Sequence, residues 1–457
     1  MRRVSLVALT IAGAGTLQGA IHGAAAQDTP VVAESTLTAT ISQSIEADSN
    51  YNLDPDSPGT TYLGDTRVGL GLMQESETQR LNFTLDTGLR ALQEPEEDFE
   101  FVLASPSSAR FAFDQDFANA AFDIELSARS RRIDQEIFDP EALLDDPDVP
   151  VPDEPGALPD DVTLITNNTF EQRYDLDTGF VTGTNSASSL GFRLRASSVD
   201  YSGDSPDDFV PRTAVEGGVA WQLRLNPVWS SAVTAGYSQE DADDDDDTKI
   251  SVTEADLGLI YQPREELSVT GGIGYAVREQ EQTIDGERST TEDDAGIALR
   301  ALANYATEDL VFALTARYTT AAPNPRFSGD FRIGYQQLRS LISARVFQDY
   351  GLGSEGDDRR LTGAGVGYAY SFNSISDFLL DFRIADSASA DDGDDVVVEV
   401  DDPDRTQLDF TAQYNHAFTP VITGSVGYQL TQRYEDPGDA TSHRVFLQIG
   451  RSFVTGF

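Results

Sequence analysis

Arginine and carboxylate side chains recur at every second position in several segments of this sequence. Arg193 and Arg195 are two residues apart, and so are Glu254 and Asp256. Because the side chains of a β-strand alternate between its two faces, each pair would lie on one face. Guanidinium groups hydrogen-bond carboxylates, so such a face could hold ion pairs, bind charged solutes or contact water. The spacing therefore predicts a polar face on a sheet.

The sequence offers little for catalysis or for holding a metal. It has no cysteine in 457 residues, which excludes disulfides and thiolate metal sites. His416 and His443 are the histidines outside the first 26 residues, and Ser442 beside His443 is adjacent in sequence rather than in a triad geometry. We also find no glycine-rich phosphate loop. We predict no enzyme activity, no catalytic residues, no cofactor and no metal site.

The chain is strongly acidic. Its formal net charge is −47, and Lys249 is the single lysine. Such a polyanion excludes nucleic acid as a partner. The acids gather in runs, such as 241–247 and 391–395, between patterned apolar segments, so we expect acidic loops on an ordered frame rather than a disordered chain. No glycine-turned calcium loop is present, but divalent cations at these loops remain an alternative.

The first 26 residues have the pattern of a secretory signal peptide. Arg2 and Arg3 precede an apolar stretch, and three alanines end at Ala26 before Gln27. Cleavage there would take the net charge to −49. No later segment reaches the roughly 18 apolar residues of a membrane helix. We therefore expect residues 1–26 to be removed, 27–34 to form a short periplasmic lead-in, and 35–457 to form one domain.

From about residue 35 onward, apolar and polar residues alternate with the period of a strand. Leu310, Phe312 and Leu314 share one face, for example, while Thr315 and Arg317 lie on the other. The segments are longer than the five or six residues usual in soluble sheets, and tilted membrane strands need about 9 to 11. Since lipid offers no hydrogen-bond partners, strands cross a bilayer only as a closed barrel.

Connections and aromatic residues support the membrane interpretation over a soluble β-sandwich, which remains the alternative. Short turns at 226–227, 263–266, 307–308 and 373 alternate with longer acidic loops at 134–160, 238–249, 280–292 and 386–404. Tyrosines near segment ends, with Trp221 and Trp229 flanking one turn, suit interfacial girdles.

We predict an all-β fold, a transmembrane antiparallel up-and-down barrel of about 16 to 20 strands, with 20 as the best count. The predicted strands are about 35–47, 62–73, 79–91, 109–115, 118–132, 161–174, 187–201, 212–225, 228–239, 249–262, 266–279, 294–306, 309–320, 325–337, 340–350, 359–371, 375–386, 404–416, 419–433 and 442–457.

The phase of the alternation places one set of charged side chains inside this barrel. They would either line an aqueous path or pair with one another and stabilise the wall, and for any one residue we favour pairing. The predicted lumen residues are Glu125, Arg129, Arg131, Arg193, Arg195, Glu216, Arg224, Glu254, Asp256, Arg278, Arg300, Arg317, Arg332, Arg345, Asp381, Arg383 and Asp409.

The last segment ends on an aromatic residue with hydrophobic residues at alternate preceding positions. Phe457, Phe453 and Ile449 fit the C-terminal signal that barrel-assembly machinery reads. Arg451 is in the same phase and would face lipid, where an arginine at mid-depth costs about 2–4 kcal/mol. A bulge, or a partner across a neighbouring strand or protomer, could relieve it.

The segments TGAGVGYAYSFN and SVTGGIGYAVRE, together with the tight turns and Phe457, resemble the putative β-barrel porins of proteobacteria. The resemblance implies residence in the outer membrane of a Gram-negative bacterium, in contact with lipid and lipopolysaccharide. Some members of that family accompany exopolysaccharide export. We expect a porin-like channel for small solutes with a cation-favouring acidic outer vestibule. An accessory barrel for polysaccharide export or a surface structure, and an outer-membrane hydrolase, are the alternatives.

Overall fold

The computed structural model describes residues 34–95, 98–103, 106–132, 170–202, 210–243, 248–264, 266–284, 287–307, 309–321, 325–352, 358–389, 405–435 and 438–456. The predicted signal peptide 1–26, nearly all of the lead-in 27–34, the loop 134–160 and Phe457 lie outside these residues. No helix in the described ranges is long and apolar enough to cross a membrane.

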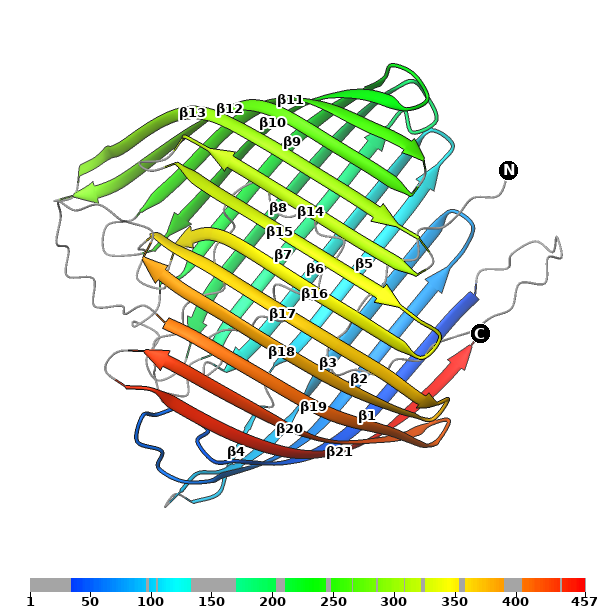
Figure 1. The fold of residues 1–457 in the computed structure, drawn as a ribbon, viewed down its shortest axis with the longest axis vertical. Helices are drawn as coiled ribbons and strands as arrows, with labels where there is room; N and C mark the ends of the chain where they lie inside the picture. Colours follow the sequence, from blue (N-terminus) through cyan, green and yellow to red (C-terminus); the bar gives the residue numbers. More distant parts are fainter. Residues whose placement is uncertain are drawn as a thin grey trace.

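The described residues form strands, which Figure 1 shows wound into a tilted barrel. Their bounds are β1 Glu34–Asp48, β2 Thr61–Glu75, β3 Gln79–Gln93, β4 Glu100–Leu103, β5 Ser107–Phe117, β6 Ala120–Arg132, β7 Phe170–Thr182, β8 Ser188–Ser202, β9 Arg212–Arg224, β10 Trp229–Ala242, β11 Lys249–Arg264, β12 Leu267–Ile284, β13 Glu287–Ala306, β14 Leu310–Thr319, β15 Arg326–Gln336, β16 Ser340–Leu352, β17 Asp358–Asn373, β18 Ser376–Ser389, β19 Arg405–Thr419, β20 Ile422–Glu435 and β21 Ala440–Gly456.

The barrel closes because the first strand pairs with the last. β1 and β21 are antiparallel from Thr36 opposite Gly456 to Asp48 opposite Arg444. Every other neighbouring pair is antiparallel too, and the short β4 pairs with the loop-end part of β3 on the same edge as β5, so that β4 and β5 count as one strand of the ring. The predicted fold class and the count of 20 barrel strands are therefore confirmed.

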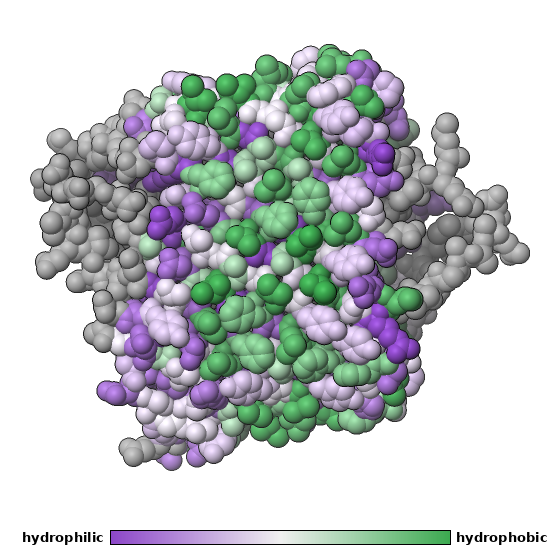
Figure 2. Space-filling view, in the orientation of Figure 1, coloured by the Kyte–Doolittle hydropathy of each residue, from purple (hydrophilic) through white to green (hydrophobic). Residues whose placement is uncertain are grey.

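Alternation gives the wall an apolar outer face and a polar inner face. On β1, Ile41 and Ile45 are 44% and 66% exposed, whereas the intervening Ser42 and Ser44 lie on the other face with Asp48. Figure 2 shows the result on one side of the barrel, where hydrophobic side chains occupy the middle of the wall and hydrophilic ones gather toward both ends. This is the distribution that a membrane-spanning barrel requires.

The two ends of the barrel differ. Both described ends of the chain, at β1 and β21, lie at one end, which we call the terminal end; the other is the loop end (Figure 1). Short connections such as 76–78 and 225–228 join strands at the terminal end. The predicted turns at 226–227, 263–266, 307–308 and 373 lie at or beside the ends of strands there, although β11 extends to Arg264 and β17 to Asn373.

Several boundary predictions were wrong. The sixth predicted strand, 161–174, corresponds to β7, which is Phe170–Thr182. In β7, Tyr174, Leu176 and Phe180 face outward, and the acidic residues 175 and 177 face inward. These acids made the segment resemble a loop. The β-branched residues before it in the sequence resembled a strand instead. The other errors were the loops 238–249, 280–292 and 386–404, the last because β18 continues to Ser389. There β10 continues to Ala242, while β12 and β13 stay paired as far as Ile284 opposite Glu287, because pairing extends the sheet beyond the apolar part of the wall.

Arg451 lies on the outer face, as predicted. It pairs with Ile422, the first residue of β20, so it sits level with the β19–β20 turn near the terminal end. Its guanidinium lies over the Phe453 ring, 4.6 Å from the centroid. The cost of a lipid-facing arginine falls to about 0–1 kcal/mol near an interface, and the ring contact offsets part of it. No bulge relieves it, since the β20–β21 register is unbroken.

The connection between β1 and β2, residues 49–60, turns inward over the loop end; we call it the rim clasp. Tyr51 packs on Leu63 and Leu92, which are inner-face residues of β2 and β3. Leu53 packs on Ala440 at the start of β21. The clasp therefore spans the inner rim from β3 to β21.

Polar contacts fix the rim clasp from both sides of the closure. The Asn50 side-chain amide donates to the carbonyls of Asp54, at 2.8 Å, and Thr441, at 3.3 Å. Arg433 of β20 is 1% exposed and donates through Nη2 to the Leu53 carbonyl at 2.6 Å. Leu53 has a φ of 46°, which costs a non-glycine residue about 1–2 kcal/mol, so these contacts hold a strained backbone.

Candidate functional site

Charged side chains encircle most of the inner wall at mid-height; we call this set the charged belt. Its members come from strands between β5 and β19, and each shares the inward phase of its strand. They are Arg110, Glu125, Asp177, Arg193, Arg195, Glu216, Glu254, Asp256, Arg300, Arg317, Asp330, Arg332, Arg345, Asp381, Arg383 and Asp409.

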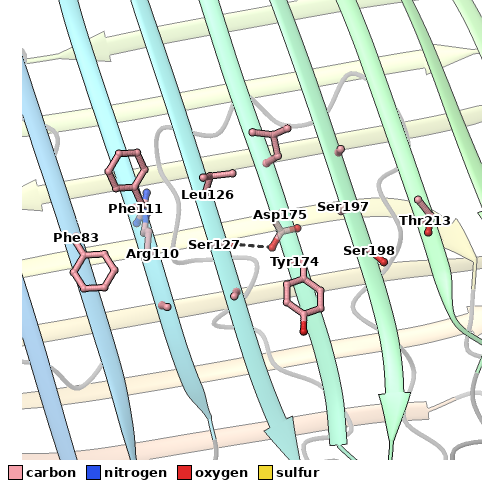
Figure 3. Close-up of a pocket in the computed structure, with 14 residues that line it drawn as sticks. Phe83, Arg110, Phe111, Leu126, Ser127, Tyr174, Asp175, Ser197, Ser198 and Thr213 are labelled. Atoms are coloured by element: carbon pink, nitrogen blue, oxygen red, sulfur yellow. Dashed lines mark hydrogen bonds between the residues drawn. The ribbon is translucent and has the colours of Figure 1, made fainter.

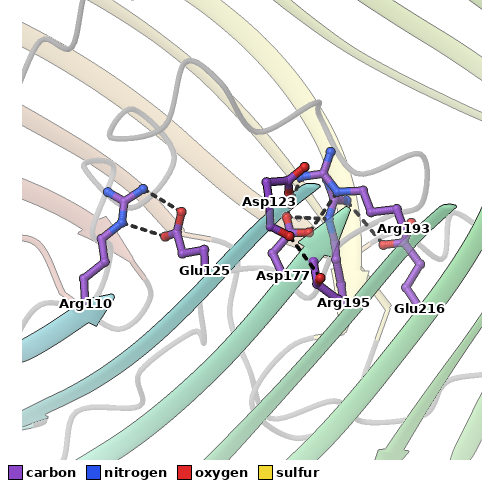
Figure 4. A network of polar contacts seen from close by, with 8 residues as sticks. Arg110, Asp123, Glu125, Asp177, Arg193, Arg195 and Glu216 are labelled. Atoms are coloured by element: carbon purple, nitrogen blue, oxygen red, sulfur yellow. Dashed lines mark hydrogen bonds and ion pairs between the residues drawn. The ribbon is translucent and has the colours of Figure 1, made fainter. Parts of the chain in front are cut away.

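The first part of the belt crosses β7 to β9. Asp177 lies between Arg193, which it contacts through a two-point ion pair, and Arg195, whose Nε is 3.3 Å away. Arg195 also reaches Glu216 on β9 at 3.3 Å. Figure 4 shows this chain of alternating charges beside the separate Arg110–Glu125 pair, where Nε and Oε1 are 2.6 Å apart. Alternating signs leave this wall close to neutral.

The second part joins β11 to β13 and β14. Arg300 and Arg317 stand directly opposite each other, which would be destabilising alone. Glu254 accepts from both, at 3.1 Å and 2.8 Å, and Asp256 lies 3.2 Å from Arg300. All four side chains are at most 13% exposed. Two carboxylates therefore compensate two adjacent arginines away from bulk water.

The third part repeats this arrangement on β15 and β16. Arg332 and Arg345 are opposite each other, and both bind Asp330, Arg332 through Nε at 2.7 Å. Arg345 also lies over the Phe347 ring, 4.9 Å from its centroid. Each arginine pair thus depends on a carboxylate for its stability.

Glycine-rich strands allow these charges to meet. Gly274 of β12 lies between Asp256 and the β13 strand, and a Cβ there would be 1.9 Å from Asp256 Oδ1. On β17, Gly365 stands between Arg345 and Arg383. Because these positions have no side chain, charged groups from the flanking strands can extend over them. The segments SVTGGIGYAVRE and TGAGVGYAYSFN therefore provide inner-wall positions without bulky side chains, over which the charged side chains of neighbouring strands extend.

The wall around the closure is different; we call it the neutral seam. Its inner face toward the terminal end consists mostly of hydroxyl, amide and glycine residues, with the Arg67–Asp86 ion pair of β2 and β3 beside them. The uncharged residues are Thr36, Thr38, Thr40, Ser42 and Ser44 of β1, Gly69 and Gly71 of β2, Thr423, Ser425 and Gly427 of β20, and Gln448, Gly450 and Ser452 of β21. These side chains carry hydrogen-bonding groups but no charge.

The remaining predicted lumen residues also have the inward phase but lie outside these three parts. Arg278 donates to Gln280 at 3.1 Å, and Asp409 accepts from Thr431 at 2.7 Å. Arg129 and Arg131 lie on β6 toward the loop end, where Arg131 binds Glu171 at 2.6 Å. Arg383 pairs with Asp381 on its own strand. Arg224 is exposed at the terminal end of β9.

Three partners in the belt were absent from the predicted set. Asp177 fell outside the misplaced sixth predicted strand, so its phase was not assigned. Asp330 shares the phase of the predicted Arg332, so the alternation of its segment would have identified it. Arg110 lies in β5 between Ala109 and Phe111, and their outward phase would have identified it.

The two histidines lie on the outer face. His416 Nδ1 is 2.9 Å from Ser376 Oγ, and the Tyr414 hydroxyl donates to Ser376 at 3.2 Å. Ser376 is 6% exposed among neighbouring aromatic rings, which leaves its hydroxyl little access to a substrate. His443 bonds the Tyr428 hydroxyl at 2.8 Å, while Ser442 points inward to Asp48. In the described part of the chain, no cluster of three or more histidine, aspartate or glutamate side chains could hold a metal ion.

Comparisons with known proteins agree with the architecture. Residues 178–330, from β7 to β15, match the family model described as outer membrane protein beta-barrel domain. No curated protein matches the sequence. Among solved structures, the apoprotein form of the FrpB iron transporter from Neisseria meningitidis has a TM-score of 0.50 at 7% identity, covering 93% of this chain and 82% of that chain. OccK7 (OpdD) of Pseudomonas aeruginosa has a TM-score of 0.37 at 11% identity, covering 92% and 99%. The chain is an outer-membrane-type β-barrel, and the likeness to FrpB concerns the fold alone.

Proposed function

We propose that this outer-membrane barrel is a porin-like channel for passive diffusion of small solutes. The charged belt is the observation that carries the proposal. A dry interior would require these ionised groups to lose their hydration at a cost of several kcal/mol each. A 20-strand barrel is also wider than the eight-strand barrels whose side chains fill the interior. A hydrated lumen reconciles the size of the barrel with the chemistry of its inner face.

The belt and the seam would have different parts in such a channel. Arginine–carboxylate pairs present a strong local field with little net charge, and they hold adjacent strands together. The neutral seam presents small hydroxyl groups that hydrogen-bond water without binding an ion tightly. Solutes would therefore pass a polar wall without a single high-affinity charge site.

We propose a preference for cations that arises at the loop end. The segments 133–169 and 390–404, which join strands at that end, contain 11 and 8 acidic residues and neither lysine nor arginine. A surplus of carboxylates raises the local concentration of cations and repels anions over about one Debye length. Divalent cations would associate with these segments in the same diffuse way.

Planar-bilayer recording of the purified, refolded chain tests the channel. We expect stepwise conductance, and a reversal potential in a KCl gradient that shows cation preference. Changing Asp391, Asp392, Asp394 and Asp395 to asparagine should lower that preference while single-channel steps persist. A charge-neutral control is Thr38→Ser in the neutral seam. Absence of steps in folded protein contradicts the channel, and an unchanged reversal potential in the asparagine variant contradicts the origin of selectivity.

The rim clasp favours a second candidate, an accessory barrel for polysaccharide export or a surface structure without free diffusion. The clasp covers part of the inner rim and is held by a buried arginine. Folded protein that shows no conductance, together with loss of exported polysaccharide when the chain is deleted, would favour this candidate over the porin.

We infer that the barrel is not an enzyme. The Ser376–His416 contact is the arrangement nearest to a hydrolase site, and its hydroxyl is buried. Replacing His416 and His443 with alanine should leave any lipase or protease activity of the purified chain unchanged. A loss specific to His416→Ala would contradict this inference.

We propose that the chain reaches the outer membrane after cleavage near Ala26–Gln27, and that assembly machinery reads Phe457, Phe453 and Ile449. Phe453 and Ile449 lie on the outer face of β21, where they would meet lipid and lipopolysaccharide. N-terminal sequencing of the mature chain and the outer-membrane yield of Phe457→Ala, relative to Thr455→Ser, test both points.

A further inference from the structure

The outer face of the wall is hollowed over β5 to β8, with Phe83 of β3 and Thr213 of β9 also lining the hollow. A groove of about 520 Å³ runs across these strands, with small side chains at its floor, among them Ala109, Ala128 and Ala196. Larger side chains, including Phe111 and Tyr174, stand beside them (Figure 3). The volume is within the range of about 300–1,000 Å³ that ligand sites occupy.

The pairing places this groove on the lipid side of the wall. Ala109 stands opposite Ala128, and Phe111 opposite Leu126, which is 44% exposed on the apolar outer face. Ser127 and Asp175 have the opposite phase and bind each other across the inner face at 3.0 Å. The surface open to an occupant is therefore almost entirely apolar and continuous with the membrane-facing wall.

Hydrogen-bonding groups lie beyond the loop-end side of the groove. The Tyr174 hydroxyl donates to Gln172 Oε1 at 3.2 Å, and the Gln172 amide donates to Ser202 Oγ at 3.2 Å. Ser198 contributes a further hydroxyl to the groove lining. An apolar trough that ends in amide and hydroxyl groups matches an amphiphile whose polar end faces the loop end.

We propose that this groove binds the acyl chain of a membrane lipid whose headgroup lies toward the loop end. Its surroundings are the hydrocarbon of the bilayer, so an acyl chain reaches it without crossing water. A second copy of the barrel fits less well. If two copies met through this face about a two-fold axis, the groove of one copy would lie against the groove of the other, and neither would be filled. The site does not depend on whether the lumen conducts.

Native mass spectrometry tests the site directly. The barrel, reconstituted in dipalmitoyl phosphatidylethanolamine vesicles and released into mild detergent, should retain one lipid. Ala196→Phe fills the floor of the groove and should lower the one-lipid adduct at least tenfold. Ala235→Phe is the matched control, because Ala235 is an exposed alanine on the outer face of β10, away from the groove. It should retain the adduct as the native chain does.

Two outcomes would overturn the proposal. One is equal lipid retention in all three proteins. The other is a dimer mass that Ala196→Phe abolishes, which would make the groove an interface between copies. Heat-modifiable migration on gels establishes that each variant is folded. If Ala196→Phe fails to fold, Ala128→Leu replaces it, and unchanged adduct in that variant overturns the site equally.

Discussion

The charged belt and the neutral seam are two solutions to holding one polar wall together. In the belt, strands from β5 to β19 are tied by arginine–carboxylate contacts between side chains. In the seam, β1 and β21 are joined by backbone pairing beneath small uncharged residues from Thr36 to Ser44, and one ion pair, Arg444–Asp48, lies at the loop end of this pairing. Side-chain chemistry therefore carries much of the specificity in one region, and main-chain register with the rim clasp carries it in the other.

The difference has an energetic consequence. An ion pair away from water contributes little net stability when intact, but removing one partner leaves a buried charge without compensation. The uncharged residues of the seam carry no such liability. Substitutions of equal size should therefore cost far more in the belt than in the seam, and the following variants test this, beginning with the largest effect.

Glu254→Gln should be the most damaging. It removes the carboxylate that both Arg300 and Arg317 bind, in a cluster at most 13% exposed, so we expect a loss of about 3–5 kcal/mol in the free energy of unfolding. Urea titration in lipid vesicles, followed by the fluorescence of Trp221 and Trp229, measures it. Glu125→Gln is the control, since its pair with Arg110 is solvent-exposed and should cost under about 1 kcal/mol. Equal costs for the two variants would contradict the description of the belt.

Arg433→Met should cost about 2 kcal/mol, because it removes a charged donor from the Leu53 carbonyl while Arg405 still compensates Glu435. The temperature at which the folded gel band disappears should fall. Arg80→Met, at an exposed pair with Glu75 near the terminal end, should leave it almost unchanged. If Arg433→Met and Arg80→Met lost the folded gel band at the same temperature, the rim clasp would not stabilise the closure of the barrel, and the prediction would be wrong.

Gly274→Ala should cost about 1–2 kcal/mol, because its Cβ would collide with Asp256 and displace that carboxylate from Arg300. Gly71→Ala in the neutral seam is the matched control, since its Cβ would be 3.7 Å from the nearest atom, on Thr38. The same urea titration compares them. A cost for Gly71→Ala as large as that for Gly274→Ala would remove the distinction between the two regions.

Arg451→Leu should change stability least, by under about 1 kcal/mol, because the arginine lies near the terminal end and gains only a ring contact. Ile449→Arg, two residues deeper on the same face, should cost more. Equal changes in the free energy of unfolding for Arg451→Leu and Ile449→Arg would show that depth along β21 does not affect the cost of an outward arginine. That result would contradict the placement of Arg451 near the terminal end.

Much of the fold follows from alternation with period two. In β14 and β18, for instance, the sequence predicts which side chains face inward, because bulky apolar residues on the outer face alternate with charged residues on the inner face. β7 was misplaced because its inward acids removed the contrast. The partners in the belt depend on strand register. Glu254 of β11 reaches Arg317 of β14 across two strands, and the inner side chains of one of them, β12, are small beside Glu254. No pattern within a single segment predicts that contact. The rim clasp joins residues hundreds of positions apart, which periodicity does not report.

The contacts of the rim clasp also define an order of events. Arg433 and Leu53 are 380 residues apart, and Asn50 and Thr441 are 391 apart. Neither contact can form until β20 and β21 exist and lie beside β1, however early β1 and β2 pair. The left-handed turn at Leu53 is therefore stabilised last, and its formation marks a barrel that has become a continuous ring rather than an open sheet.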